Sequence, residues 1–270
     1  MPTDPQSLIN LQKYPLFDGI ARAQLVQKAR QHIQNEGSAI LPDFVLPVGI
    51  DLMRAEAVHL QPQSHRRERM LGAYVDDVPD ISDQTHPVKR KSPYRMWVTA
   101  TDQMDPAGAT LMIYEWPPLI RLVADILDLD DLFTVADPMM RCNYTFLGDG
   151  DEHGWHFDGN DFVVSLMIQA ADTGGAFEFA PNIRDADAPN YAGVRDVMDD
   201  KPGLTRRINA KPGTLALFRG QRALHRVTRV SGGTKRIIAL LSYHEQPGLM
   251  NGPDAQFRVF GRSYGQPAHT

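Results

Sequence analysis

Residues 154–159 have the sequence GWHFDG, and the interpretation of the chain starts from this stretch. Side chains two apart on an extended chain point to the same side, so His156 and Asp158 can face one metal ion. Trp155 and Phe157 then point away from that ion, and we expect them to pack in the core. A His-x-Asp pair recurs by chance, so this pair needs support from the rest of the chain.

The support comes from one histidine and one arginine further along the chain. His225 follows His156 by 69 residues, and Arg236 comes eleven residues after His225 at the start of the apolar run 237–243. Two imidazoles and one carboxylate form the facial triad of non-haem iron(II) oxygenases, which leaves coordination positions open. A hairpin through residues 231–233 would lay the last strand beside His225. Arg236 could there bind a carboxylate through two parallel hydrogen bonds.

The sequence after Pro138 is rich in short β-type runs. Gly-Asp, Gly-Gly and Pro-Gly pairs separate these runs, as in an antiparallel sandwich or a small barrel. The expected strands are 140–147, 162–169, 176–179, 214–218, 224–230 and 236–243. One short helix is expected at 190–199.

The first 130 residues are expected to be mostly helical. Apolar residues recur at helical spacing in 20–33, 47–60 and 119–127. Residues 63–92 are polar and charged, so they form either a mobile excursion or a lid. We therefore predict a single α+β domain over 1–270. Its parts are a mainly helical support with a possible lid (1–137), a β-core (138–262) and a tail (263–270).

Composition excludes several functional classes. The chain has 270 residues, 42% of them hydrophobic, and a net charge of −5. No basic stripe runs along it, which argues against binding to nucleic acid or to a membrane surface. The basic tracts 66–69 and 89–91 are expected to be solvated faces. The oligomeric state is not indicated.

Cysteine usage and hydropathy bear on where the protein works. The single cysteine, Cys142, allows neither an internal disulfide nor a cysteine metal cage. There is no signal-peptide pattern at the start and no apolar run of the roughly 20 residues that span a membrane. We expect a soluble protein of the reducing cytoplasm.

The motif His156-x-Asp158 with a distal His225 and Arg236 resembles the Fe(II)/2-oxoglutarate-dependent dioxygenase superfamily. The resemblance covers about residues 138–262. It implies a double-stranded β-helix (a jelly-roll, cupin-like core) with packed N-terminal helices. It also implies that the first three residues bind Fe(II), that Arg236 binds the distal carboxylate of 2-oxoglutarate, and that O2 is consumed.

Four stretches resemble a narrower group, the BesD/HalD-like halogenases and hydroxylases of free amino acids; they are 154–158, 174–179, 181–184 and 212–218. Halogenases of this group replace the metal-binding carboxylate with a small residue so that chloride can bind. Asp158 is present here, which favours hydroxylation. The expected reaction is hydroxylation of an unactivated C–H bond of a small substrate, a free amino acid or a derivative.

Further residues are candidates for binding the cosubstrate or substrate. Three residues could help Arg236 to bind the cosubstrate carboxylate, namely Asn143, Thr228 and Ser242. Each could equally make only ordinary hydrogen bonds within a strand. His153 resembles a substrate-contacting histidine of the amino-acid enzymes, although it could equally be a solvated loop residue. Arg141 and Arg95 could bind an anionic group of the substrate, and Glu115 and Asp161 an ammonium group; surface roles compete for all four.

Other interpretations stay open from the sequence. The same cofactors support desaturation, epimerisation or ring formation, in which the product gains no oxygen atom. A cupin-like enzyme would not need 2-oxoglutarate, but its usual His-x-His pattern with a following Glu is missing. A barrel that binds metal without turnover is a further alternative. His153 and His156 could also form a different metal pair with Asp151 or Asp161. Finally, 63–92 and 181–205 are expected to close over the site.

Overall fold

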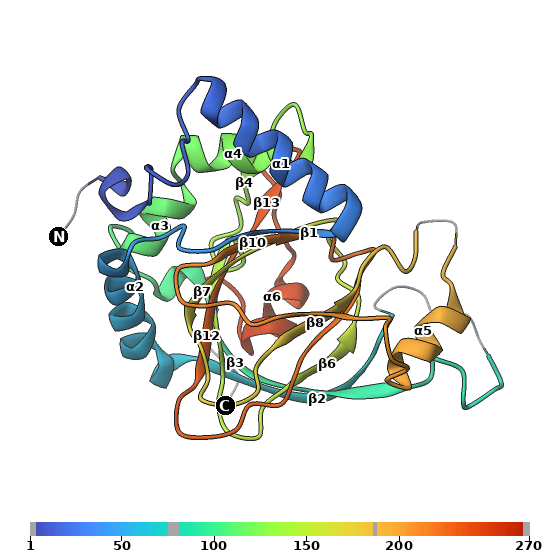
Figure 1. The fold of residues 1–270 in the computed structure, drawn as a ribbon. Helices are drawn as coiled ribbons and strands as arrows, with labels where there is room; N and C mark the ends of the chain where they lie inside the picture. Colours follow the sequence, from blue (N-terminus) through green and yellow to red (C-terminus); the bar gives the residue numbers. More distant parts are fainter. Residues whose placement is uncertain (1–3, 75–80, 186–187, 267–270) are drawn as a thin grey trace.

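The structure is a computed structural model that describes residues 4–74, 81–185 and 188–266 (Figure 1). Its centre is a curled sheet of eleven antiparallel strands, in the order β1-β10-β7-β12-β5-β3-β6-β11-β8-β9, with β2 paired to β3. The sheet folds over on itself, so its two halves face each other across a central space (Figure 1). This arrangement is the predicted double-stranded β-helix.

The two halves have separate roles. The major sheet comprises β1 (Ser38–Leu41), β10 (Leu215–Phe218), β7 (Val163–Gln169), β12 (Arg236–Leu241) and β5 (Cys142–Leu147). The minor sheet comprises β6 (His153–His156), β11 (Leu224–Val227), β8 (Phe177–Ala180) and β9 (Arg206–Ile208). Strand β3 (Lys91–Thr99) pairs with both β5 and β6 and so joins the sheets, while β2 (His65–Gly72) extends β3. A separate pair is formed by β4 (Phe133–Thr134) and β13 (Tyr243–His244).

The helices cover the outside of the major sheet (Figure 1). They are α1 (Ile20–Glu36), α2 (Pro47–Leu60), α3 (Ala109–Tyr114) and α4 (Pro117–Leu127). Helix α5 (Tyr191–Met198) lies beside the minor sheet, and α6 (Pro253–Phe260) follows the last strand. Short 3₁₀ turns are η1 (Pro5–Leu8), η2 (Gln61–Gln63) and η3 (Thr101–Gln103). None of the described helices is long and apolar enough to cross a membrane.

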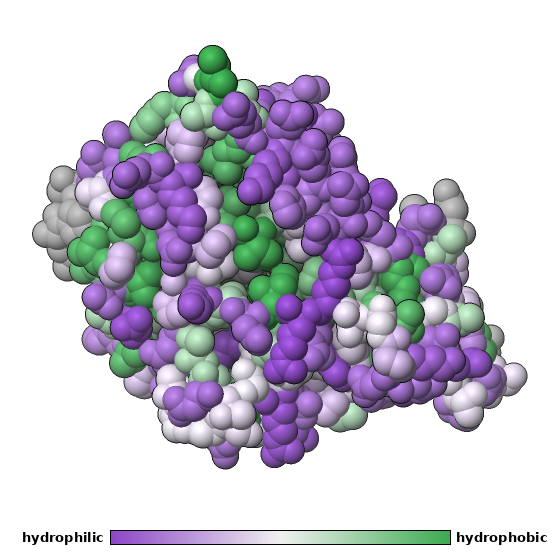
Figure 2. Space-filling model, in the orientation of Figure 1, coloured by the Kyte–Doolittle hydropathy of each residue, from purple (hydrophilic) through white to green (hydrophobic). Residues whose placement is uncertain are grey.

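Strand alternation separates the core from the cavity. On β5, Tyr144 and Phe146 point outward and are fully buried against the helices, while Asn143 and Thr145 line the space between the sheets. The same period of two holds on β7 and β12. On the face of the molecule drawn in Figure 2, hydrophobic side chains are visible near the centre and on the left, among many hydrophilic ones.

The N-terminal part differs from the prediction. Helices at 20–33, 47–60 and 119–127 are confirmed. However, β1, β2 and β3 also belong to the main sheet, so the sheet does not start after Pro138 and 63–92 is not only a lid. The strand β2 lacks apolar alternation because it lies at an edge and much of it faces solvent. Residues 75–80 within this segment lie outside the described residues, as do 186–187 of the second expected lid and 267–270 of the expected tail.

The connection from β11 to β12 also differs from the prediction. The sequence predicts a hairpin through 231–233 that lays the strand starting at Arg236 beside His225. Instead β11 pairs with β6 and β8, whereas β12 pairs with β5 and β7. The chain crosses from the minor to the major sheet, so Arg236 and His225 face the same cavity from opposite walls.

Candidate metal centre

Three side chains meet at the end of β6. His156 is the last residue of that strand and pairs in register with His225 on β11, and Asp158 follows two residues later. The ligand atoms of the three lie within 4.8 Å of one another. Within the described residues this is the one group of three or more His, Cys, Asp or Glu side chains that could hold a metal ion.

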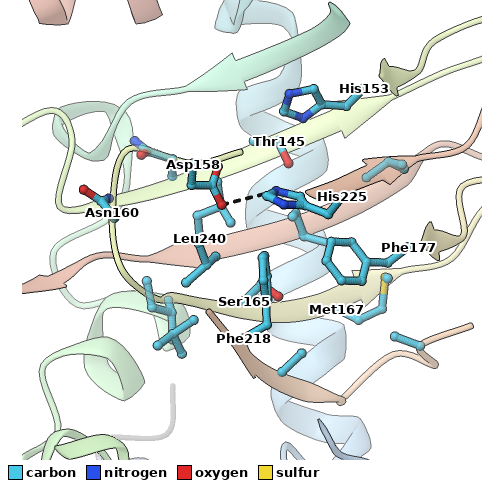
Figure 3. A pocket seen from close by; sticks show the side chains of 18 of the residues that line it. Thr145, His153, Asp158, Asn160, Ser165, Met167, Phe177, Phe218, His225 and Leu240 are labelled. Carbon is cyan, nitrogen blue, oxygen red and sulfur yellow. Dashed lines mark ion pairs between the residues drawn. The ribbon is translucent and has the colours of Figure 1, made fainter. Parts of the chain in front are cut away.

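Hydrogen bonds fix the orientation of both imidazoles. Nδ1 of His156 lies 2.8 Å from the carbonyl oxygen of Gly154, and Nδ1 of His225 lies 2.8 Å from that of Ala223. Each Nδ1–H therefore donates to a backbone carbonyl, which leaves Nε2 as the lone-pair donor. The two Nε2 atoms lie 3.6 Å (His156) and 3.2 Å (His225) from the oxygens of Asp158, and Figure 3 shows Asp158 pointing at His225. The donor set is two imidazoles and one carboxylate, as an iron(II) triad requires.

The protonation states suit metal binding. Burial, together with the neighbouring His225, lowers the pKa of His156 to about 3, so this ring is neutral at pH 7. Burial opposes ionisation of Asp158, but the two facing histidines hold the pKa of its carboxyl below its ordinary value. Ligands must be deprotonated to bind a metal, and these two already are.

The backbone at Gly220 leaves room for Asp158. The Asp158 amide donates to the Gly220 carbonyl over 3.1 Å. A Cβ at position 220 would lie 2.3 Å from Oδ2 of Asp158. Gly220 is therefore part of the site although its backbone is unstrained, and no sequence pattern identified it.

Arg236 is a buried cation for which the described residues supply no carboxylate counter-ion. Arg236 is 5% exposed and lines the cavity, and its Nε has no hydrogen-bond partner. Burial lowers the pKa of its guanidinium to about 10. Gly175 packs directly on it, because a Cβ there would lie 3.0 Å from Cδ of Arg236. Since a buried charge is costly unless it is paired, this position fits an anionic ligand.

Some of the candidate binding residues also reach the cavity. Asn143 and Ser242 line it, and the Asn143 amide donates to the carbonyl of Met139 over 2.8 Å. The hydroxyl of Thr228 accepts from the Ala176 amide over 3.0 Å, within the backbone of the minor sheet. His153 lines the cavity and stacks on His156, with ring centroids 3.6 Å apart. Burial, with His156 and His225 nearby, lowers the pKa of His153 well below its ordinary value.

Four other candidates are not brought to the cavity. Arg141 and Glu115 pair with each other over 2.7 Å, and Asp161 pairs with Arg219 and Arg222. Arg95 alternates with the cavity-facing residues of β3, so it points outward to Glu68 and Glu152, at 3.3 and 3.5 Å. The alternative metal ligand Asp151 instead accepts from Arg66 over 2.7 Å.

The β2–β3 hairpin contributes cavity residues that the sequence prediction missed. Tyr94, Met96 and Val98 line the cavity from β3, and Arg67 lines it from β2. The period of two at 94, 96 and 98 could have indicated them. Arg67 had no such indication, because it lies in a basic run that was assigned to solvent.

The cavity between the sheets has a volume of about 330 Å³, near the lower end for small-molecule sites. The metal-binding residues lie at one part of it. Figure 3 shows Phe177 beside His225 and, on the opposite wall, Ser165 and Met167. A space of this volume suits small molecules.

The family model of halogenase D matches residues 21–252, which is most of the chain. The chain belongs to the halogenase D family. No curated protein sequence matches it. As a member of this family it is an enzyme of the Fe(II)/2-oxoglutarate-dependent oxygenase superfamily, and its cofactors are Fe(II), 2-oxoglutarate and O2.

Solved structures share the fold of this halogenase D family member at low sequence identity. A 2OG-Fe(II) oxygenase family protein from Burkholderia pseudomallei is 15% identical, with a TM-score of 0.52, over 83% of this chain and 92% of that one. A Pseudomonas putida prolyl-4-hydroxylase is 12% identical, with a TM-score of 0.50, over 80% and 98%. The α-ketoglutarate-dependent epimerase SnoN from nogalamycin biosynthesis is 11% identical, with a TM-score of 0.57, over 82% and 81%.

Proposed function

We propose that this enzyme hydroxylates an unactivated C–H bond of a small substrate, an amino acid or a derivative of one. His156, Asp158 and His225 hold the iron, and Arg236 binds the distal carboxylate of 2-oxoglutarate. The observation that carries the choice of hydroxylation is Asp158. Its carboxylate faces both histidines, at 3.6 and 3.2 Å, where a halogenase needs a vacancy for chloride.

The orphaned Nε of Arg236 supports the cosubstrate assignment. An incoming carboxylate would give this guanidinium the counter-ion that the described protein does not supply. A guanidinium binds a carboxylate through two parallel hydrogen bonds, so Arg236 fixes the direction of the cosubstrate as well as its charge. Asn143 and Ser242 would add polar contacts to the cosubstrate from the cavity walls. Thr228 would support the site indirectly, because its hydroxyl holds the backbone amide of Ala176.

When bound, Fe(II) with 2-oxoglutarate and dioxygen supplies the oxidant for an unactivated C–H bond. The protein's own part is to place one C–H bond and keep water out. Met167, Phe177 and Leu240 make apolar walls near the triad, and the rings of His156 and His225 are held by their carbonyl partners. These fixed walls and rings favour oxidation at one C–H bond of the substrate.

The proposal also includes an amino-acid substrate and a location in the cytoplasm. The cavity volume of about 330 Å³ suits a small molecule. Cys142 is a buried free thiol, as in proteins of reducing compartments. Desaturation, epimerisation and ring formation remain competing outcomes, because the same hydrogen abstraction can lead to each of them.

The experiment is turnover in ¹⁸O2 with chloride present, using the iron-loaded enzyme and a panel of amino acids and derivatives. We expect succinate and a product that gains one oxygen-18 atom and no chlorine. The control variant Asp158→Gly should lose this hydroxylation. A chlorinated wild-type product would contradict the proposal, and so would a product without the label.

A further inference from the structure

We propose that Arg67 forms a second anion-binding subsite and that the substrate is a net monoanion with an uncharged remainder. The chemical class is an N-acylated amino acid or a simple carboxylic acid, and not a basic amino acid. This inference rests on the proposed function, because it assumes that iron and 2-oxoglutarate share the cavity with the substrate.

Arg67 reaches the cavity from the edge strand β2. Its guanidinium donates to the hydroxyl of Tyr94 and lies over that ring, 4.5 Å from the centroid. Its Nε is buried and has no hydrogen-bond partner. Tyr94 is a neutral partner, so it leaves the charge of Arg67 unbalanced.

Two neighbouring arginines are paired with carboxylates, unlike Arg67. Arg66, the preceding residue on β2, pairs with Asp151 over 2.7 Å, and Arg95 on β3 pairs with Glu68 over 3.3 Å. No described carboxylate pairs with Arg67. Arg69 also lies over the Tyr94 ring, at 5.4 Å, but it is exposed to solvent. Of these arginines, Arg67 is the one that lines the cavity, and there it is left for a ligand.

A chain of ring contacts connects Arg67 to the metal centre. Its guanidinium contacts Tyr94, whose ring lies 4.2 Å from that of His153, and His153 stacks on the metal-binding residue His156 at 3.6 Å. Two rings thus separate the guanidinium from the triad. A substrate with its acidic group at Arg67 would reach along these two rings to place a C–H bond near the metal.

The fixed charges of the loaded cavity favour an anion. Fe(II), Arg67 and Arg236 contribute four positive charges, and Asp158 with dianionic 2-oxoglutarate contributes three negative ones. One positive charge remains. A monoanion neutralises it, a zwitterionic amino acid leaves it, and protonated lysine raises it to two.

The remaining walls favour an uncharged tail. Among the described lining residues the one carboxylate is Asp158, which faces the two histidines. Met96 and Val98 continue the wall from Tyr94, and Leu147 faces the same space. An ammonium group in this cavity would lose its hydration without gaining a free carboxylate as a counter-ion, which is costly.

The test is calorimetric titration of the anaerobic Fe(II)/2-oxoglutarate complex, in which no turnover occurs. The probes are matched free and N-acetyl forms of alanine, norleucine and phenylalanine, together with lysine, which has nearly the shape of norleucine. We expect at least one N-acetyl form to bind about tenfold or more tightly than its free partner, and lysine to bind weakest. Arg67→Gln should weaken the best anionic probe by about 10–100-fold, while Arg95→Gln should leave its affinity unchanged.

Three results would overturn the inference: free amino acids or lysine that bind as tightly as the acetylated probes, equal effects of the two arginine variants, or no binding by any anionic probe. The binding of 2-oxoglutarate is measured separately from the charge-transfer absorption of the complex. If wild-type protein gives no such absorption, the proposed function fails. If only Arg67→Gln loses it, Arg67 binds the cosubstrate and the subsite is wrong.

Discussion

At the scale of single residues, the site depends on close contacts that no motif describes. Asp158 completes the triad only because position 220 lacks a side chain, and Arg236 has its place because position 175 is also glycine. The His-x-Asp, His and Arg pattern could be predicted from the sequence because its members are few and their chemistry is distinctive. The role of Arg67 could not be predicted from the sequence, because the basic run in which it lies has the composition of a solvated face.

The first prediction concerns Gly220. In Gly220→Ala the new methyl group would meet the Asp158 carboxylate, so that ligand must move. We expect iron affinity to fall by about 10–100-fold, the usual range for disturbing the support of a metal ligand. Gly159→Ala is the matched control, because a Cβ there meets nothing within 4 Å. Competition titration with a chelator measures both, and equal affinities would contradict the prediction.

The second prediction concerns pH and the metal-free protein. An unfolded histidine has a pKa of about 6.5, whereas burial lowers that of folded His156 to about 3. Between these values only the unfolded chain binds the proton, so stability is lost as pH falls below about 6.5. Protonation of His156 in the unfolded chain should therefore lower the free energy of unfolding by about 1 kcal/mol as the pH falls from 7 to 5.5.

Urea unfolding with a chelator present, at these two pH values, measures this loss. His156→Gln should reduce the pH dependence, and His59→Gln, on an exposed face of α2, should leave it unchanged. The same dependence in all three proteins would show that His156 is not buried in the neutral form.

At the scale of secondary-structure elements, prediction succeeded where local chemistry marks the ends. Pro47 starts α2 and Pro62 follows its end at Leu60, and the short helix expected at 190–199 is α5. Prediction failed where pairing is non-local. Strand β2 has charged residues because it is an edge, and the β11–β12 connection changes sheets, which no turn sequence reveals.

The two segments expected to close over the site contact each other. Arg90 pairs with Asp199 over 2.5 Å and donates to the Met198 carbonyl over 3.0 Å, and the hydroxyl of Tyr74 donates to the Pro189 carbonyl over 3.0 Å. Both segments pack near Trp155 and Phe157, in the cluster behind the metal-binding strand. Closure of one segment should therefore depend on the other.

The third prediction tests that dependence by limited proteolysis. Arg90→Ala should increase cleavage within 181–205 several-fold, with little change in global stability because the ion pair is partly exposed. The control Arg54→Ala breaks a surface pair with Asp51 on α2. 2-Oxoglutarate with substrate should protect the wild-type segment. Identical cleavage of all samples would show that the segments do not close together.

At the scale of the whole molecule, the helices stabilise the sheet that carries the site. The outward residues of the major sheet and the inward residues of α1–α4 form one apolar cluster. The same strands present cavity residues on their other face. The class of fold could be predicted because this alternation is local, but the position of each helix on the sheet could not.

The fourth prediction measures this support. Leu119 of α4 is fully buried, so Leu119→Ala should lower the unfolding free energy by about 2–5 kcal/mol. Ile20→Ala, at a position that is 80% exposed, should change it by less than about 0.5 kcal/mol. Urea denaturation distinguishes the two, and a small effect at Leu119 would mean that α4 is not needed for the fold.

The central claim is that His156, Asp158 and His225 hold Fe(II) while Arg236 orients 2-oxoglutarate on it. The most direct measurement is the anaerobic visible spectrum of the protein with Fe(II) and 2-oxoglutarate. We predict a weak metal-to-ligand charge-transfer band in the wild type. The band should be weakened or lost in His225→Ala and Asp158→Ala, and Arg236→Gln should need far more 2-oxoglutarate to produce it. Folded, iron-loaded wild-type protein without this band would contradict the claim.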